Sequence, residues 1–143
     1  MTVALILAQK GSQVFTASTR QTLEDVANEL TSRGVGALVV LDDADVVVGV
    51  IGERDVVQAI ANRGAAALSE RVAMHMNKNW RFVTEDESVE ETARTMTLER
   101  CRHLPVLRDG RLAGVVSIGD VVKWRIEMIE AEREALHRYI ATA

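Results

Sequence analysis

The chain has 143 residues and a formal net charge of −4 at pH 7, with 48% hydrophobic but only 3% aromatic residues. This length holds one compact core or two small half-domains that share one, and the core must be mainly aliphatic. The negative charge argues against a nucleic-acid partner, because binding to phosphate backbones relies on clustered lysine and arginine. No apolar run approaches the roughly 20 residues that span a bilayer, and the single Cys101 has no partner for an internal disulfide. We therefore expect a cytoplasmic protein without a nucleic-acid or membrane partner.

An apolar stretch at residues 3–8 lies near the start of the chain. It has no basic region before it, is too short for the apolar part of a signal peptide, and leads directly into Lys10 and Gly11. We expect no signal peptide at this position.

An internal repeat organises most of the remaining sequence. Residues 21–30 align with residues 87–96 at an offset of 66, and residues 49–57 align with residues 114–122 at an offset of 65. A one-residue difference in an intervening turn accounts for the change of offset, because surface turns absorb insertions that strands cannot. The pattern therefore predicts a duplicated structural unit.

Each copy contains a short amphipathic helix near its start. Apolar positions recur at i, i+3, i+4 and i+7 in both copies, which places them on one helix face. Ser88 followed by Glu91 is a capping-box pattern, and Thr22 with Asp25 is a weaker version of it. The two stripes are Leu23, Val26, Ala27 and Leu30 in the first copy and Val89, Thr92, Ala93 and Met96 in the second.

A β-hairpin follows each of these helices. Aliphatic runs at residues 37–41 and 104–107 each precede a polar turn and a second β-branched run. The turn in the second copy contains Asp109 and Gly110, a pair that favours tight hairpins. We also expect leading strands around residues 13–16 and 80–83.

A second helix begins at Asp55 in the first copy and at Asp120 in the second. The first of them runs toward Gly64, which can adopt the left-handed conformation that ends many helices. The helix after Asp120 is longer, and one of its faces carries an apolar stripe among charged residues. Such a stripe needs a partner surface, so we expect a homodimer. The stripe consists of Val122, Ile126, Ile129, Leu136 and Ile140.

The duplicated unit resembles a tandem CBS-domain protein, or Bateman module. In residues 49–55 and 114–120 the second hairpin strand ends in glycine and two hydrophobic residues, and an aspartate follows at the start of a helix. The second copy adds the run His103-Leu104-Pro105-Val106 and the Gly110 hairpin. The ordered set occurs twice and covers the chain from about Val14 to about Trp124.

This resemblance implies an α/β (α+β) fold of two β-α-β-β-α CBS motifs, packed through their sheets with pseudo-two-fold symmetry. Residues 1–143 would then form one stand-alone CBS-pair module. We expect the first motif at residues 8–66, a packed linker at 67–79, the second motif at 80–126 and a C-terminal helix extension at 127–143.

Proteins of this family commonly bind AMP, ADP, ATP, NAD(H) or S-adenosylmethionine in two related clefts, and they usually regulate rather than catalyse. On this resemblance Asp120 would accept hydrogen bonds from the ribose, and Ser117 would donate to ribose or phosphate. Arginines before the first core strand would bind phosphate, together with the helix N-terminus after Ser117. The residues expected to contact a nucleotide are Asp120, Ser117, Gly119, Val116, Arg102, His103, Arg100, Gly36, Ala37, Thr16, Asp55, Arg54, Gly52, Ile51, Leu104 and Val83.

The first copy departs from the family pattern, because Gly52 stands where a hydroxyl residue is usual. Arg54, in the position of Gly119, could compensate by reaching a phosphate. Asp55 would still accept from a ribose, with the backbone of residues 102–104 facing the adenine. We rank the cleft at Asp120 above the cleft at Asp55.

Plainer explanations exist for several of these residues. Asp55 and Asp120 could act only as helix N-caps, and the arginines could form a solvated rim. The histidines are scattered, and the lone Cys101 completes no metal-ligand pattern. No nucleophile, base and orienting residue occur together, so we expect no enzyme, no metal and no catalytic cofactor.

Two functional hypotheses follow. The first is a regulatory sensor that binds AMP, ADP, ATP or NAD(H), with S-adenosylmethionine ranked behind them, and that acts on an unknown regulated protein. The alternative is a structural homodimerisation or partner-docking module with degenerate nucleotide sites.

Overall fold

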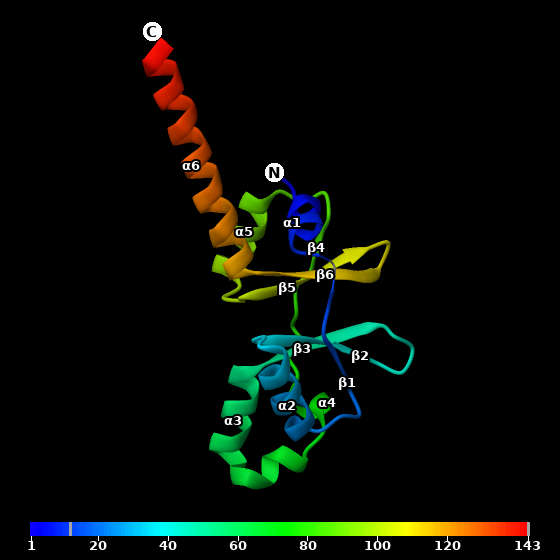
Figure 1. Cartoon of the computed structure of the whole chain (residues 1–143). Helices are drawn as coiled ribbons and strands as arrows, with labels where there is room; N and C mark the ends of the chain where they lie inside the picture. Colours follow the sequence, from blue (N-terminus) through cyan, green and yellow to red (C-terminus); the bar gives the residue numbers. More distant parts are fainter. Residues whose placement is uncertain (12, 143) are drawn as a thin grey trace.

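A computed structural model of the chain describes residues 1–11 and 13–142. It consists of two halves whose three-stranded sheets face one another, with the helices on the outer side of each sheet (Figure 1). The first half contains β1 (Thr16–Ser18), α2 (Leu23–Arg33), β2 (Ala37–Leu41), β3 (Val47–Gly52), α3 (Glu53–Arg63), the 3-10 helix η1 (Gly64–Ser69) and α4 (Val72–His75). The second contains β4 (Val83–Thr84), α5 (Val89–Leu98), β5 (His103–Arg108), β6 (Arg111–Ser117) and α6 (Ile118–Thr142), with α1 (Val3–Lys10) packed on it.

The two sheets have the same topology. In each, a short leading strand pairs in parallel with the first hairpin strand, and the hairpin strands are antiparallel. Even the irregularities match, because the register shifts between Val40 and Leu41 in one sheet and between Val106 and Leu107 in the other. The predicted α+β fold of two β-α-β-β-α units is therefore confirmed.

The leading strands are shorter and later than the sequence pattern predicts. β1 begins at Thr16 and β4 at Val83, the last residues of the two expected ranges. Each strand is paired on one side only, so the neighbouring strand determines its length. Gly64 also differs from the prediction: its φ of 71° is positive, but its ψ of −162° is extended rather than left-handed helical, because the chain continues directly into η1.

Side-chain caps set the first helix of each half. Thr22 Oγ1 accepts a hydrogen bond from Asp25 N at 3.2 Å, and Asp25 Oδ2 accepts one from Thr22 N at 3.0 Å. The pair that looked weaker in the sequence thus forms the complete reciprocal capping box. In the second half Ser88 Oγ accepts from Glu91 N at 3.1 Å.

Each half has its own aliphatic core between its sheet and its helices. Leu38 and Val40 belong to the first core, and Leu104 and Val106 to the second. Val39 lies between the two residues of the first core, and Pro105 between the two residues of the second. Because side chains alternate between the faces of a strand, Val39 and Pro105 point to the opposite face of their sheets, and both are buried. The two halves therefore pack through the faces of their sheets that carry no helices.

Helix α1 is an element that the sequence analysis did not predict. Its residues Val3, Ile6 and Leu7 lie in the core of the second half, although the first motif was expected to begin at residue 8. A Cβ atom on Gly114 would lie 2.7 Å from Leu7 Cδ2, so the glycine in β6 permits the close approach of α1. The N-terminal segment is thus part of the second half, and the chain then crosses to the first.

The expected linker at residues 67–79 contributes to the first half before the chain crosses back. Ala67 and Val72 are fully buried in the first core. Asn77 then forms a two-way backbone bridge with Val50 on β3, at 2.8 and 3.3 Å.

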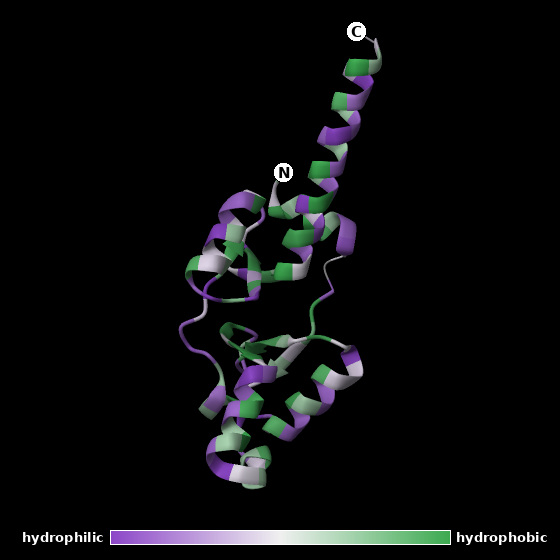
Figure 2. Ribbon diagram, turned by 90° about the vertical axis from the view of Figure 1, so that its left-hand side faces the viewer, coloured by the Kyte–Doolittle hydropathy of each residue, from purple (hydrophilic) through white to green (hydrophobic). Residues whose placement is uncertain are grey.

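Helix α6 begins on the body of the second half and continues far beyond it. Val121 and Trp124 are buried in the second core, whereas every residue from Ile129 to Thr142 is exposed. Figure 2 shows this free part carrying both apolar and polar residues. Among the described residues, no helix combines the length and apolarity that a membrane span requires.

Candidate functional site

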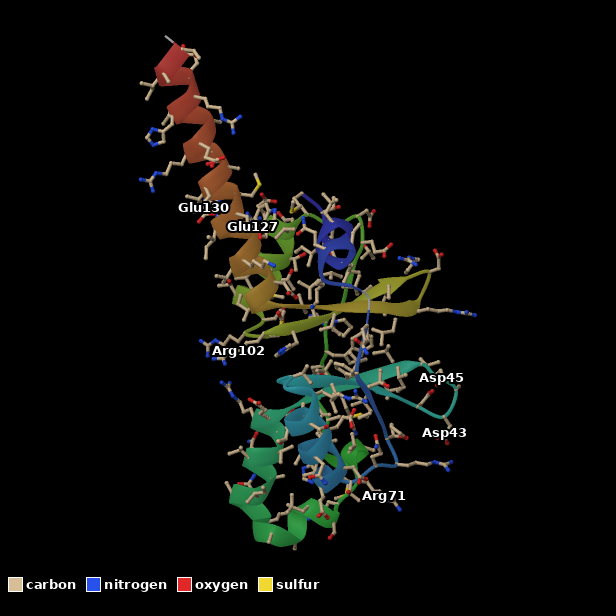
Figure 3. All side chains as sticks on the ribbon, in the orientation of Figure 1. Asp43, Asp45, Arg71, Arg102, Glu127 and Glu130 are labelled. Atoms are coloured by element: carbon tan, nitrogen blue, oxygen red, sulfur yellow. The ribbon has the colours of Figure 1, made fainter. Side chains whose placement is uncertain are left out.

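A cavity of about 530 Å³ lies between the two halves, a volume typical of small-molecule sites. The loop before β2, the junction of β3 with α3 and the loop before β5 form its walls, and the segment between α4 and β4 closes it. Figure 3 shows Arg102 in the gap between the halves. The lining residues are Gly36, Ala37, Val50, Gly52, Glu53, Arg54, Asp55, Val57, Asn77, Asn79, Trp80, Arg81, Glu99, Arg100, Cys101, Arg102, His103 and Leu104.

Asp55 is the half-buried acidic residue of the cavity, which Glu53 and Glu99 also line. Its Oδ2 accepts a hydrogen bond from Gly52 N at 2.8 Å, which caps α3. Burial raises the pKa of Asp55 above its usual value, against the opposite effects of that hydrogen bond and of the Arg54 charge. Within the described ranges the carboxylate has no ion-pair partner, and Oδ1 has no hydrogen bond. Asp55 is thus not the N-cap of α3, which is Gly52, but the third residue of the helix, whose side chain accepts from the N-cap backbone. This capping bond uses one carboxylate oxygen and leaves Oδ1 available as an acceptor.

Positive charge in the cavity comes from arginines of both halves. Arg54, Arg100 and Arg102 are exposed, and none of the ion pairs among the described residues includes them. Arg81 is paired with Glu99 at 3.6 Å. Three guanidinium groups are thus available to an anion, for which they are strong hydrogen-bond donors.

Arg100 is held in an unfavourable backbone conformation. Its φ is 53°, in the left-handed region that favours glycine. The repeat-equivalent residue is Gly34, with a φ of 64°. The following residues make equivalent helix-ending bonds, from Cys101 N to Met96 O and from Val35 N to Leu30 O, both at 3.1 Å. The second copy therefore keeps an arginine beside the cavity at a position where the backbone favours glycine.

Two glycines allow the backbone to pack closely around the cavity. A Cβ on Gly36 would lie 3.2 Å from His103 Cε1 of the other half, and a Cβ on Gly52 would lie 3.0 Å from the Gly36 carbonyl oxygen. The same carbonyl accepts a hydrogen bond from Glu53 N at 3.1 Å. The absence of a side chain at Gly52 therefore leaves room for the loop that carries Gly36.

His103 and Cys101 contribute little charge to the cavity at neutral pH. Burial lowers the pKa of His103, and the nearby Lys10 ammonium lowers it further. Burial raises the pKa of the Cys101 thiol. The described residues contain no group of three or more His, Cys, Asp or Glu side chains that could hold a metal ion.

The cleft at Asp120 is different, because Lys10 of α1 occupies it. Lys10 Nζ lies 2.7 Å from Asp120 Oδ2 and 2.9 Å from the Val115 carbonyl oxygen. Asp120 Oδ2 also accepts from Ser117 N, and Ser117 Oγ accepts from Asp120 N. Burial raises the pKa of Asp120, but the bonds from Lys10 and Ser117 outweigh burial and hold the pKa below its usual value.

The expected nucleotide contacts therefore separate into distinct groups. Ser117, Gly119 and Asp120 lie at the second cleft, and Thr16 is exposed at the start of β1. The side chains of Ile51, Val83 and Val116 are buried in the two cores and do not line the cavity. The residues that meet in the cavity at Asp55 are Gly36, Ala37, Gly52, Arg54, Asp55, Arg100, Arg102, His103 and Leu104.

Several residues at the two clefts were not identified from the sequence. Trp80 and Arg81 begin the expected leading strand at residues 80–83, but no motif marked their side chains as contacts of a ligand. Lys10 lies outside the repeat, and only the docking of α1 brings it to Asp120. The ranking of Asp120 above Asp55 did not include this lysine. In the structure Asp55 lines both described cavities, and Asp120 lines neither of them.

Comparison with known proteins agrees with this architecture. Residues 11–62 and 70–127 match the sequence profile of the CBS domain. The chain belongs to the CBS-domain family. It is 31% identical over 147 residues to the mitochondrial CBS domain-containing protein CBSX3 of Arabidopsis thaliana, an alignment that covers 97% of this chain and 71% of that protein.

Solved structures support the same assignment. A CBS-domain protein from Agrobacterium tumefaciens has a TM-score of 0.84 and 40% identity, covering 87% of this chain and 92% of that one. A more distant CBS domain pair, solved in complex with 5′-methylthioadenosine and S-adenosyl-L-methionine, has a TM-score of 0.80, with 23% identity and coverage of 90% and 98%. At that identity the second comparison shows a shared fold.

Proposed function

We propose that this chain is a regulatory module that binds an adenine nucleotide in the cavity at Asp55. The observation that carries the proposal is the combination, in one cavity of about 530 Å³, of the Asp55 carboxylate with three arginines, none of which has an ion-pair partner among the described residues. A carboxylate offers only acceptors, which suits the hydroxyl groups of a ribose. Guanidinium groups suit the phosphates of the same ligand.

The positions of the polar groups along the cavity support this proposal. Asp55 lies where β3 meets α3, and Arg54 and Arg102 come from opposite halves. The backbone at Gly36 and Ala37 lines the cavity and would face the edge of a base. A ligand that contacts both halves would bind better to one packing of the halves than to another, which is the requirement for a switch.

The ligands that this proposal includes are AMP, ADP, ATP and NAD(H), with S-adenosylmethionine ranked behind them. One CBS pair of the same fold was solved with two adenosine-containing ligands. The arginines favour a phosphorylated ligand over an uncharged one in this chain. The module would act on a regulated protein that remains to be identified, and it would need no catalytic group of its own.

A homodimer is also part of the proposal, because the apolar stripe on α6 is exposed. The alternative, an assembly module with degenerate sites, is favoured by one observation: Lys10 occupies the acceptor of the second cleft. The two functions differ in whether the Asp55 cavity binds a ligand.

Calorimetric titration of the purified chain with AMP, ADP, ATP, NADH and S-adenosylmethionine tests the proposal. We expect at least one to bind, and Asp55→Asn to weaken binding tenfold or more, about 1.4 kcal/mol. The matched control is Asp120→Asn, which changes the repeat-equivalent carboxylate and should leave the affinity within about twofold. Trp80 lines the cavity whereas Trp124 is buried in the second core, so Trp80→Phe should remove any ligand-induced change in tryptophan emission.

Two outcomes would overturn the proposal. If none of the five ligands binds, the assembly module is the better description. If Asp120→Asn abolishes binding and Asp55→Asn does not, the ligand site is the second cleft, and Lys10 must leave Asp120 for a ligand to bind.

A further inference from the structure

Helix α6 carries an exposed apolar face that nothing in the described chain covers. Val122 is 50% exposed, Ile126 52%, Ile129 49%, Leu136 59% and Ile140 62%. Single exposed apolar residues are ordinary on protein surfaces, but a continuous row along one helix is not. The exposed part of α6, residues 129–142, is also short enough to be marginal as a helix in water without packing partners. The row therefore indicates a missing partner.

The spacing of the row identifies the kind of partner. From Val122 the steps are four, three, four, three and four residues when Arg133 is included, which is the a/d repeat of a coiled coil. In this assignment Ile126, Arg133 and Ile140 occupy a positions, and Val122, Ile129 and Leu136 occupy d positions. We call these six residues the seam.

The seam lies on a different side of α6 from the residues that attach the helix to the body. Val121, Trp124 and the half-buried Met128 pack on the second core. At 3.6 residues per turn, the mean side-chain direction of these three residues and that of the seam differ by about 130° around the helix axis. A second helix can therefore pack along the seam without displacing any core contact of α6. Figure 1 shows the free part of α6 extending well away from the rest of the chain.

We propose that two copies of this chain associate through the seam as a parallel two-helix coiled coil. The charges beside the seam favour this occupant and this orientation. In a parallel pair the g position of one helix faces the following e position of the other. Arg125 then faces the opposite charge of Glu130 of the second copy, and Glu132 faces the polar side chain of His137 of the second copy. Arg133, the polar residue of the seam, faces Arg133 of the second copy, and Glu132 of the second copy lies beside each of these guanidinium groups and offsets the like-charge contact.

An antiparallel pair of the same two seams, centred on residue 131, would place like charges together. Glu130 would face Glu130 of the second copy, and Glu132 would face Glu132 of the second copy, near the middle of the contact. Facing like charges are destabilising. Arg125, Glu130 and Glu132 take part in none of the ion pairs found within the described chain, so all three are available to a partner. Figure 3 labels Glu127 and Glu130 where α6 leaves the body.

The dimer does not depend on nucleotide binding, because the seam shares no residue with the cavity at Asp55. Sedimentation velocity of the full chain at tens of micromolar tests it directly. We expect a dimer for the wild type and a monomer for Leu136→Glu. Ala135→Glu adds the same charge at the neighbouring exposed position on the opposite side of the helix, and it should remain a dimer. A monomeric wild type, or equal behaviour of the two variants, would overturn the proposal.

Cross-linking distinguishes the two orientations. In a Cys101→Val background, a cysteine at position 136 faces its own equivalent only in the parallel pair. Leu136→Cys should therefore form a disulfide-linked dimer with oxidised glutathione, whereas Ala135→Cys should not. Charge reversal gives a second measurement: Arg125→Glu should weaken the dimer several-fold, and Arg125→Glu with Glu130→Arg should restore it. Failure of both the cross-link and the restoration would exclude the parallel arrangement.

Discussion

The ammonium nitrogen of Lys10 lies 2.7 Å from Oδ2 of Asp120, and this contact distinguishes two clefts that the repeat would otherwise make equivalent. Asp55 and Asp120 occupy the same place in the two halves, and each accepts a hydrogen bond at 2.8 Å from the backbone three residues earlier. Only Asp120 has a lysine partner among the described residues. A symmetric fold thus contains one free acceptor and one paired acceptor.

The Lys10 contact should stabilise the fold to a small, pH-dependent extent. Lys10→Met keeps the length of the side chain and removes its charge. The two side chains are 35% and 21% exposed, so solvent screening limits the expected loss to about 0.5–1 kcal/mol at pH 7. Because the pKa of Asp120 lies below its usual 3.8, this stabilisation is present above pH 3.8 and is lost as the pH falls through the lowered value.

Urea unfolding of wild type and Lys10→Met at pH 7 and at successively lower pH checks this prediction. The difference between the two proteins should shrink as the pH falls below 3.8. Lys123→Met removes a lysine from the exposed side of α6 and should have no comparable effect. Equal stability of wild type and Lys10→Met at pH 7 would contradict the prediction.

Arg100 should destabilise the folded protein, although its side chain should contribute to nucleotide binding in the cavity. Its φ of 53° is unfavourable for any residue with a Cβ, by roughly 1 kcal/mol. Arg100→Gly should therefore be more stable than Arg100→Ala by about that amount, and both should bind a nucleotide several-fold more weakly than wild type. Thermal unfolding and calorimetric titration of the three proteins separate the two effects. Full binding by Arg100→Gly would mean that the arginine has no part in the site.

Much of the fold could be predicted because its signals are local. The repeat, the apolar stripes of α2 and α5 and the caps at Thr22 and Ser88 are all visible within a few residues of sequence. The docking of α1 could not be predicted in this way. Val3, Ile6 and Leu7 have no long periodic pattern, and their partners lie about a hundred residues away in the chain.

The candidate site also contains residues that could be predicted from local sequence and residues that could not. Residues that belong to the repeat, such as Asp55 and His103, were identified and do line the cavity. The difference between the clefts was not foreseen, because Lys10 is 110 positions from Asp120. Trp80 likewise reaches the cavity only through the path of the chain between the two halves.

His103 should make the stability of the protein depend on pH near neutrality. Burial and the Lys10 charge lower its pKa below 6.5, so the unfolded chain takes up this proton at a higher pH than the native protein does. Stability from this group is therefore complete above pH 6.5 and falls as the pH drops through 6.5 toward the lowered value. His103→Gln should show a flatter decline between pH 7.5 and 5 in denaturant unfolding. Parallel pH profiles for the two proteins would be evidence against a perturbed histidine.

The contact between Gly114 and Leu7 should control how α1 docks on the second half. A Cβ at position 114 would lie 2.7 Å from Leu7 Cδ2 and 3.2 Å from Leu7 Cδ1, so Gly114→Ala must displace the leucine. We expect a destabilisation of about 1–3 kcal/mol, the usual cost of overpacking a core.

A double-mutant cycle with Leu7→Ala isolates this contact, because that change removes the atoms that the new Cβ would meet. Gly114→Ala should then cost much less in the Leu7→Ala background than in wild type, and the difference measures the coupling between β6 and α1. Additive losses would show that the alanine acts through the backbone of β6 and not through α1. A large coupling would also predict a weaker Lys10–Asp120 contact in Gly114→Ala, because Lys10 is the last residue of the displaced helix.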